Sequence, residues 1–324
     1  MELRPRRQFK ESPEMPIDVI EFGLGGAAAA CAVLFTNPLE VVKTRFQLQG
    51  ELKAWGTYQR HYRNVFHAFY TIGRYDGLLA LQAGLPPAII YQILQNGTRL
   101  GTYQSLIDMG LTKNKAGQTS LPKTMLAAGV AGYAGAFVSS PMYLIKTQMQ
   151  SQSREVIAVG HQHTHSGWLQ GLKRIYVEGG VKGLWRGVNA QTMRNGIGSV
   201  AQLTAFSQTK DFVTKTEVFR PGSLFIPIIA SMVAGAANVV VMTPLDVIST
   251  RMYNQGVDER GKGLYYRGVW DCATKIWRKE GLVGFYKGWS ASWFRLAPQT
   301  VLSLSFWDLG RKLYYRNFDK NQST

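Results

Sequence analysis

The chain has 324 residues, of which 45% are apolar, 12% aromatic and 18% charged. This composition is too apolar for a disordered chain and too poor in charge for a long coiled coil. Its two cysteines, Cys31 and Cys272, exclude a disulfide scaffold and a cysteine-rich metal site. The 37 basic residues outnumber the 20 acidic ones, and the resulting net charge of +17 favours anionic partners.

Residues 1–16 are expected to form an N-terminal tail. They carry four basic side chains, but also three acidic side chains and three prolines. A cleavable transit peptide is amphipathic and poor in acid, so this segment does not resemble one. We therefore expect the targeting information to lie inside the folded part of the chain.

Charge-free stretches follow the tail, at residues 22–39, 77–98, 124–145, 195–209 and 221–245. The longest of them reach the length of about 20 residues that spans a bilayer. The segments 48–75, 151–178 and 254–279 between them are basic and polar. Clustering of lysine and arginine on one side of a membrane is the usual signal of sidedness.

The chain is a triplicate. Pro38, Pro141 and Pro244 follow one another at intervals of 103 residues. The first opens the motif Pro-x-acid-x-x-Lys-x-Arg-x-Gln, and each proline segment is followed by an acid–glycine turn that closes at Gly84, Gly187 or Gly288. Each unit therefore predicts an apolar helix with a proline kink, a short amphipathic helix and a second apolar helix.

These patterns predict an all-α membrane protein. Six transmembrane helices form three repeats with pseudo-threefold symmetry around a central cavity, and short amphipathic helices accompany them. The predicted repeats cover residues 17–115, 116–219 and 220–316, and residues 317–324 form a C-terminal tail.

The triple motif resembles the mitochondrial carrier family over about residues 17–316. The resemblance implies a transporter, not an enzyme, that exchanges a small and usually anionic metabolite across the mitochondrial inner membrane by alternating access. It implies no cofactor, no metal, no nucleic acid and no obligate protein partner. It also implies cardiolipin as a lipid partner, at the matrix-side helix termini.

In this family the acid of one repeat pairs with the lysine of the next, in a ring that closes the matrix side. The acid and lysine of one motif are three residues apart and share a helix face. The resemblance implies the matrix-gate pairs Glu40 with Lys146 and Asp246 with Lys43, while the third pair is Tyr143 with Ser249 and carries no charge. The glutamines one turn further along are expected to brace these pairs by hydrogen bonding; they are Gln47 and Gln150.

The cytoplasmic gate that the family pattern implies is incomplete here. The pattern aromatic-acid-x-x-basic is kept at Asp308 and Arg311, and only fragments remain around Lys210 and Gln104. One acid then faces two bases, so we expect ion pairs to hold the cytoplasmic side closed only weakly.

The substrate site is predicted from helix register. Tyr91, Arg194 and Arg295 each lie seven residues after the closing glycine of their repeat, so they share one depth near the bilayer midplane. These are the family's contact points. Two arginines at one height suit two carboxylates, because each guanidinium can make two parallel hydrogen bonds. Asn195 completes a family pattern for carboxylic and keto acids.

Arg99 lies about 12 Å beyond the level of Tyr91, because a helix rises 1.5 Å per residue. We expect it to act as a funnel charge or a first landing site for anions, with helix-end snorkelling as the alternative. Gln95 lies between the two levels as a polar neighbour.

The segment Leu81-Gln82-Ala83-Gly84-Leu85 and the two arginines look closest to the oxaloacetate carrier-like branch. The expected substrates are therefore oxaloacetate, malate, malonate or a sulfate-like dianion. A two-residue slip in register would instead place Gly196-Ile197 at the contact point, a pattern of nucleotide carriers. A carrier for a nucleotide or another bulky anion is thus the alternative.

Other classes of protein fit the sequence less well. A basic nucleic-acid-binding protein would explain the charge but not the repeated apolar spans, and high salt would release it from membranes. No nucleophile–base pair or paired carboxylates indicate an enzyme. The run His161-Gln162-His163-Thr164-His165 is interpreted as a solvated loop rather than a metal site.

Overall fold

The computed structural model describes residues 17–54, 56–114, 118–216, 225–258 and 261–322, and within them the chain is helical with two isolated β-bridges. The long helices are α1 (Ile17–Leu48), α3 (Leu85–Asp108), α4 (Leu121–Ser151), α6 (Val188–Lys215), α7 (Phe225–Asn254) and α9 (Trp289–Gln322). The shorter ones are α2 (Val65–Tyr75), α5 (Trp168–Leu184) and α8 (Val269–Phe285), with 3₁₀ turns at Leu78–Gln82 and Glu155–Ile157. The predicted tail 1–16 and the predicted repeat boundaries at 115/116 and 219/220 lie outside the described residues.

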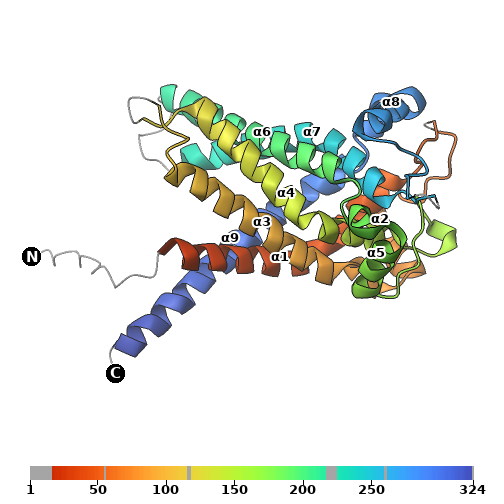
Figure 1. The fold of residues 1–324 in the computed structure, drawn as a ribbon, viewed down its shortest axis with the longest axis horizontal. Coiled ribbons are helices and arrows are strands. Elements are labelled where there is room, and N and C mark those ends of the chain that lie inside the picture. The colour runs from red at the N-terminus through yellow and green to blue at the C-terminus, as the bar shows by residue number, and fades with distance from the viewer. Residues whose placement is uncertain (1–16, 55, 115–117, 217–224, 259–260, 323–324) are drawn as a thin grey trace, which may run out of the picture.

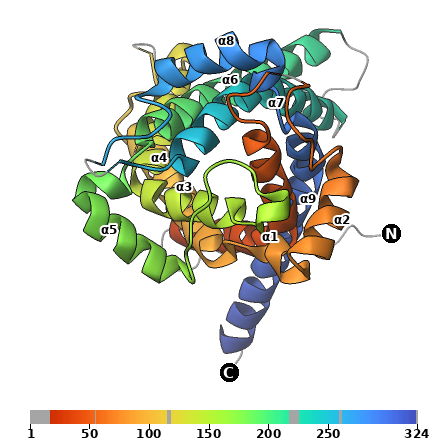
Figure 2. The ribbon, with the colours of Figure 1, turned by 90° about the vertical axis from the view of Figure 1, so that its right-hand side faces the viewer.

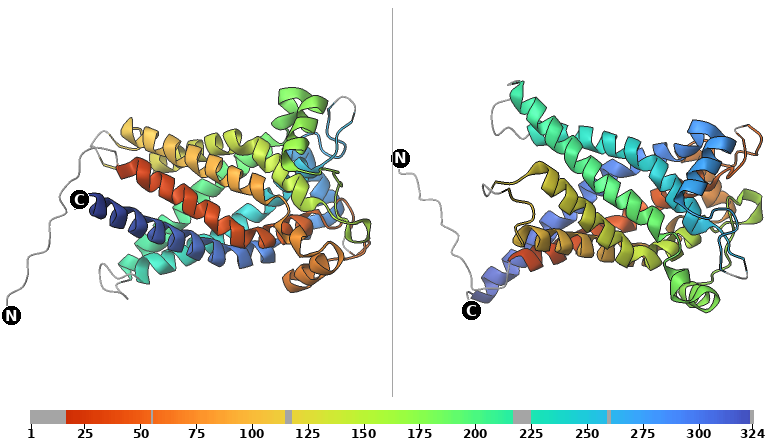
Figure 3. Two further views of the ribbon diagram at one scale, coloured as in Figure 1. Left: turned by 90° about the horizontal axis from the view of Figure 1, so that it is seen from below. Right: turned by 45° about the horizontal axis from the view of Figure 1, so that its top comes forward.

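The six long helices form one bundle, in which α1 packs against α9, α3 against α4, and α6 against α7 (Figure 1). The short helices α2, α5 and α8 lie together at one end of the bundle, and an end-on view shows them spaced around it (Figure 2). The first turn of α1 and the last turn of α9 lie at the opposite end, toward which the long helices diverge (Figure 3). We call these the short-helix end and the terminus end. The arrangement confirms the predicted pseudo-threefold bundle.

Four stretches of helix are long and apolar enough to cross a membrane, judged by length and composition: Leu24–Leu48, Leu78–Asp108, Leu121–Ser151 and Ser231–Asn254. The other two predicted spans, α6 and α9, have 28 and 34 residues but carry more polar side chains. Some of these polar side chains, such as Gln202 and Gln299, line a cavity inside the bundle. The helix α9 also continues to Gln322, so residues 317–322, expected as a tail, are helical.

The three motif prolines lie inside α1, α4 and α7, where each removes one backbone hydrogen bond. Two of the freed carbonyls find partners from the following turn. The carbonyl oxygen of Leu34, four residues before Pro38, accepts from Nε2 of Gln82 at 3.0 Å. That of Phe137, four residues before Pro141, accepts from Nε1 of Trp185 at 2.9 Å. Gln82 and Trp185 occupy equivalent positions, so the unusual glutamine preserves the hydrogen bond of the aromatic residue.

The glycine that closes each turn fixes the depth of the next helix. Gly84, Gly187 and Gly288 have φ of 68°, 86° and 81°, a left-handed conformation that favours glycine. A Cβ on Gly84 would lie 3.1 Å from the carbonyl oxygen of Lys146, and one on Gly288 would lie 3.3 Å from that of Lys43. Each glycine therefore packs on the first long helix of the next repeat: Gly84 on α4, Gly187 on α7 and Gly288 on α1.

Candidate functional site

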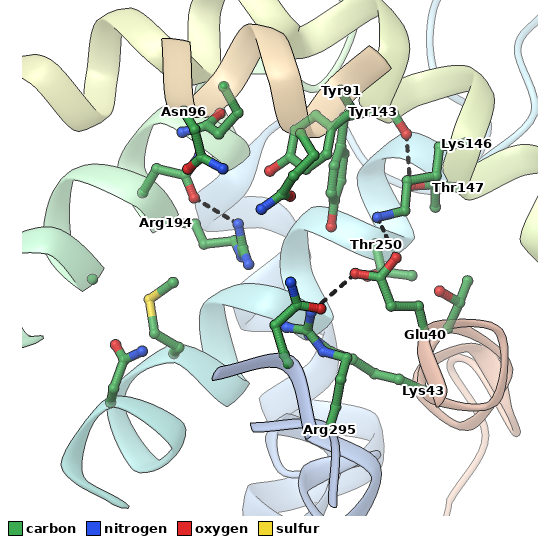
Figure 4. A pocket seen from close by; sticks show the side chains of 18 of the residues that line it. Glu40, Lys43, Tyr91, Asn96, Tyr143, Lys146, Thr147, Arg194, Thr250 and Arg295 are labelled. Carbon is green, nitrogen blue, oxygen red and sulfur yellow. Dashed lines mark hydrogen bonds and ion pairs between the residues drawn. The ribbon is translucent and has the colours of Figure 1, made fainter. Parts of the chain in front are cut away.

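A polar cavity of about 290 Å³ lies among the six long helices. Every predicted substrate-binding residue lines it, as do most of the predicted matrix-gate residues (Figure 4). These lining residues are Tyr91, Gln95, Arg99, Arg194, Asn195, Arg295, Glu40, Lys43, Gln47, Tyr143, Lys146 and Gln150. Helices far apart in the sequence thus line one cavity.

Asp246 on α7 binds two cations from other helices. Its Oδ2 lies 2.5 Å from Nζ of Lys43 on α1, and its Oδ1 accepts a hydrogen bond from Nε of Arg194 on α6. The Nη1 of Arg194 also donates to Oδ1 of Asn195 at 2.6 Å. Asp246 is only 4% exposed, so water screens these interactions little. We call Asp246, Lys43 and Arg194 the Asp246 triad.

Glu40 on α1 makes the equivalent set of contacts. Its Oε2 lies 2.6 Å from Nζ of Lys146 on α4, and its Oε1 accepts from Nη1 of Arg295 on α9 at 3.0 Å. We call these three residues the Glu40 triad. In both triads the acid comes from one repeat, the lysine from the next and the arginine from the one after. Both predicted gate pairs are therefore present, and each also holds an arginine that was predicted to bind substrate.

The third set of equivalent positions carries no charge. Tyr143 takes the place of the acid, Ser249 that of the lysine and Tyr91 that of the arginine. The rings of Tyr91 and Tyr143 lie 5.1 Å apart, centroid to centroid. Ser249 is fully buried and its Oγ has no hydrogen-bond partner among the described residues, so it does not bond to Tyr143 as the pairing rule implied. Loss of all three charges together leaves no unpaired ion at this position.

Gln47 and Gln150 do not brace the ion pairs, which corrects the expectation for them. The Oε1 of Gln150 accepts from Oγ1 of Thr44 at 3.0 Å, and that of Gln47 accepts from Oγ1 of Thr250 at 2.7 Å. These bonds join α1 to α4 and α1 to α7, one turn closer to the short-helix end than the ion pairs. In each case the threonine hydroxyl satisfies the amide oxygen of the glutamine, and the lysines pair with the acids.

A second ring of contacts, which the sequence reasoning did not identify, closes the ends of these helices. Nε of Arg45 donates to the carbonyl oxygen of Gln150, and Nε of Arg251 donates to that of Gln47, at 3.3 and 3.1 Å. At the third position Nε2 of Gln148 donates to the carbonyl oxygen of Tyr253 at 3.3 Å. The threefold spacing of these residues, 103 positions apart, was the signal that could have revealed the ring.

The acids of the acid–glycine turns hold this second ring. Asp76 lies 2.6 Å from Nη1 of Arg45, and Glu280 accepts from both Nη1 and Nη2 of Arg251 at 2.5 and 2.9 Å. Burial raises the pKa of Glu280, but the hydrogen bonds and charge of Arg251 outweigh it, so that the pKa lies below its ordinary value. In the second repeat Gly179 stands at the acid position, where it matches the uncharged Gln148.

The contact between α4 and α7 is therefore the weakest of the three in electrostatic terms. The α1–α4 and α1–α7 contacts each contain a buried ion pair, whereas the described residues place none between α4 and α7. Neutral contacts occupy that position instead: the hydroxyl of Tyr253 bonds to Oγ of Ser140 at 2.7 Å, and Oγ of Ser151 donates to Oδ1 of Asn254 at 2.5 Å. We call this contact the neutral seam.

Two of the predicted cytoplasmic-gate residues bond to a neighbour on their own helix. Asp308 pairs with Lys312 of its own helix at 2.6 Å, and Nε2 of Gln104 donates to Asp108 of its own helix at 2.9 Å. Arg311 lies over the ring of Trp307, at 5.2 Å from its centroid, and Lys210 is exposed. These residues lie where the helices diverge (Figure 3). The conformation is thus one whose ion pairs close the short-helix end.

The three histidines are not a solvated loop, which corrects their interpretation from sequence. The rings of His161 and His163 meet edge to face with centroids 4.7 Å apart, those of His163 and His165 stack 5.5 Å apart, and all three are partly buried. A nitrogen of His163 bonds to the carbonyl oxygen of Asn254, and one of His165 bonds to Oε1 of Gln148. Burial lowers the pKa of His163 to about 3, so this imidazole is neutral at physiological pH. The described residues contain no group of His, Cys, Asp and Glu arranged to hold a metal.

Comparison with known proteins agrees with this architecture. The family model for mitochondrial carrier proteins matches residues 18–114, 117–217 and 221–318. Solute carrier family 25 member 35 of Mus musculus is 53% identical, over 91% of this chain and 98% of the mouse protein. The mitochondrial oxaloacetate transport protein of Saccharomyces cerevisiae is 39% identical over 91% of this chain and 89% of its own length, and mitochondrial citrate transporter E of Aspergillus niger is 38% identical over 92% and 94%. The chain therefore belongs to the mitochondrial carrier family, and it is a transporter of the mitochondrial inner membrane rather than an enzyme.

Proposed function

We propose that this carrier exchanges small dianions by alternating access, and that its substrates are of the oxaloacetate, malate, malonate or sulfate type. The observation that carries the proposal is the pair of equivalent arginines, Arg194 and Arg295, at one level of a polar cavity. Each is held by a carboxylate of the chain itself, Asp246 or Glu40. The site therefore already binds two carboxylates, at the positions where a dicarboxylate would offer its own.

The charge balance of this layer favours a doubly negative substrate. Two carboxylates are shared among four cations, so that two positive charges are not balanced within the triads. Two donors in the cavity wall, Nε of Arg295 and Nδ2 of Asn195, are buried and have no acceptor among the described residues. Leaving a buried donor unpaired costs about 1–3 kcal/mol, and an anion with several oxygen atoms removes that cost.

The two triads suggest how substrate binding opens the gate. A dianion that enters from the terminus end takes Arg194 and Arg295 for its carboxylates, in competition with Asp246 and Glu40. Each gate acid then keeps a single cation, its lysine. The loss of one charge-assisted hydrogen bond per acid weakens the closed short-helix end, which in this family faces the matrix. Binding of the substrate to the arginines thus offsets the free-energy cost of breaking these gate contacts. Without substrate nothing offsets this cost, and the short-helix end stays closed.

The printed names of the relatives support a carboxylate substrate. The relatives from Saccharomyces cerevisiae and Aspergillus niger are named for oxaloacetate and for citrate transport. Both compounds carry several carboxylates, and neither is a nucleotide. Binding of cardiolipin at the matrix-side helix termini stays a prediction from the family resemblance.

Reconstitution into liposomes tests the proposal. Liposomes that contain the purified carrier are loaded with unlabelled substrate. Uptake of labelled oxaloacetate, malate, malonate, sulfate, citrate and ADP is then measured for each compound in turn. We expect exchange of the dianions, and we expect R194A and R295A to abolish it while a thermal-unfolding assay still shows folded protein. Exchange of ADP without exchange of any small dianion would replace the proposal with the nucleotide alternative. Exchange of a neutral or cationic compound alone would refute both.

A further inference from the structure

We propose that the hydroxyls of Tyr143 and Tyr91 form a hydrogen-bonding arm that recognises the 2-oxo oxygen of a dicarboxylate. The inference rests on the proposed function, because it assigns a substrate class to the same cavity. It goes further because it predicts that the carrier prefers 2-oxo dianions to dianions that have no oxygen atom between their carboxylates.

The position of the two tyrosines follows from the pseudo-threefold arrangement. Two of the three equivalent sectors of the cavity are charged and present Arg194 and Arg295. The third sector presents Tyr91 at the arginine position and Tyr143 at the acid position, with ring centroids 5.1 Å apart and planes tilted by 56°. In Figure 4 the two tyrosines lie together, with Arg194 to one side of them and Arg295 across the cavity. A ligand held by both arginines therefore faces this pair.

The hydroxyls of the pair are available. Both tyrosines line the cavity, and neither hydroxyl has a hydrogen-bond partner in the part of the chain that the structure describes. Tyr253, which packs on Tyr143 with centroids 5.0 Å apart, behaves differently. Its fully buried hydroxyl donates to Oε1 of Gln191 at 2.7 Å and also bonds to Ser140. Within one cluster of three rings, the structural hydroxyl is satisfied and the two that line the cavity are not.

Lys146 increases the donor character of this sector. Its ammonium nitrogen lies 5.0 Å from the ring centroid of Tyr91 and 5.8 Å from that of Tyr143, within the range of cation–π contacts. The positive charge beside the rings makes the sector attractive to an acceptor oxygen. Because Lys146 is paired with Glu40, its charge does not require a third carboxylate on the substrate.

The chemistry of the arm matches a carbonyl. A phenolic hydroxyl donates one hydrogen bond, and a ketone oxygen only accepts. In a four-carbon 2-oxo diacid the carbonyl lies between two carboxylates, so that two arginines and a neutral donor match its three oxygen-bearing groups. Malonate and succinate have nothing to offer the tyrosines and leave both hydroxyls without a ligand partner.

The test compares competitors against one tracer. Wild-type carrier, Y143F, Y91F and the double variant are reconstituted, and uptake of labelled malonate is inhibited by unlabelled oxaloacetate or by unlabelled succinate. We expect each single variant to lower the preference for oxaloacetate over succinate by about three- to tenfold, the effect of one hydrogen bond. Inhibition by succinate should stay as in the wild type, because phenylalanine keeps the ring.

The control variant is Y253F, which removes a hydroxyl from the same cluster. It should lower the melting temperature but leave the ratio of the two inhibition constants unchanged. An unchanged ratio in Y143F, Y91F and the double variant would overturn the inference, and so would an equal loss of inhibition by both competitors. A wild-type carrier that takes up no dianion would instead refute the proposed function itself, so the two failures are distinguishable.

Discussion

Nη1 of Arg295 lies 3.0 Å from Oε1 of Glu40, although the two residues are 255 positions apart in the chain. One carboxylate thereby joins the predicted gate to the proposed substrate site. The same is true of Asp246, which binds both Lys43 and Arg194. We therefore expect a change at either acid to affect gate closure and substrate binding together, so variants of these acids need to be compared with variants of their lysines.

The first prediction concerns the pair of Glu40 and Lys146. We expect E40K and K146E each to lose more than about 90% of exchange, because a buried charge without its partner costs about 3–5 kcal/mol. The double variant E40K/K146E should recover part of the activity. Recovery will be incomplete, because the introduced lysine lies against Arg295. Initial exchange rates in liposomes measure this, and equal inactivity of all three variants would show that the pair does not form in the membrane.

A second prediction concerns Arg99, which lines both the central cavity and an adjoining hollow of about 450 Å³ toward the terminus end. No salt bridge joins it to a described residue. We expect R99A to raise the apparent KM for a dianion by about three- to tenfold and to leave kcat unchanged, since a charge at the entrance concentrates anions. The effect should shrink at high ionic strength, and R99K should restore most of the affinity. A fall in kcat at unchanged KM would contradict this role.

The neutral seam provides a third prediction. Introducing an ion pair with Y143E/S249K should stabilise the closed short-helix end, raise the melting temperature and slow exchange. Y143E alone should lower the melting temperature, because it buries a carboxylate without a cation. Thermal unfolding and exchange rates of the same preparations separate the two effects. Faster exchange by the double variant would show that opening does not involve the seam.

The fourth prediction concerns the carbonyl that Pro38 frees. Q82L should lower the stability of the carrier by about 1–3 kcal/mol, because the carbonyl of Leu34 would then lose its donor in an apolar environment. Q82W should be much less destabilising, since the indole of Trp185 makes the equivalent bond in the second repeat. Thermal unfolding in detergent compares the three proteins. Equal melting temperatures for Q82L and the wild type would show that the carbonyl of Leu34 does not need the hydrogen bond from Gln82.

The repeat predicted the helices, because three sequences in phase impose one geometry. The two ion pairs, Glu40 with Lys146 and Asp246 with Lys43, were implied by the family resemblance, and the structure contains both. The contacts of Arg194 and Arg295 with the gate acids did not follow from spacing. They depend on how far a guanidinium reaches across the bundle, which equal helix depth does not specify. The same limit explains Gln150, which lies on the expected face but bonds to Thr44 of α1.

The partial burial of the histidines was missed for a different reason. Composition suggested a hydrated loop, because His161, His163 and His165 alternate among polar residues. Gln148 stands where the other repeats have an arginine, and a ring nitrogen of His165 bonds to its Oε1. The local pattern of the histidines does not reveal a partner that lies 17 positions earlier in the chain.

The uncharged set formed by Tyr143, Ser249 and Tyr91 also limits which substitutions the protein tolerates. A single charge introduced at one of the three positions would be a buried ion with no counterion. The three positions are therefore coupled, although each belongs to a different repeat. Charge can enter this sector only through concerted substitutions, so the cavity stays asymmetric, with two charged sectors and one neutral sector.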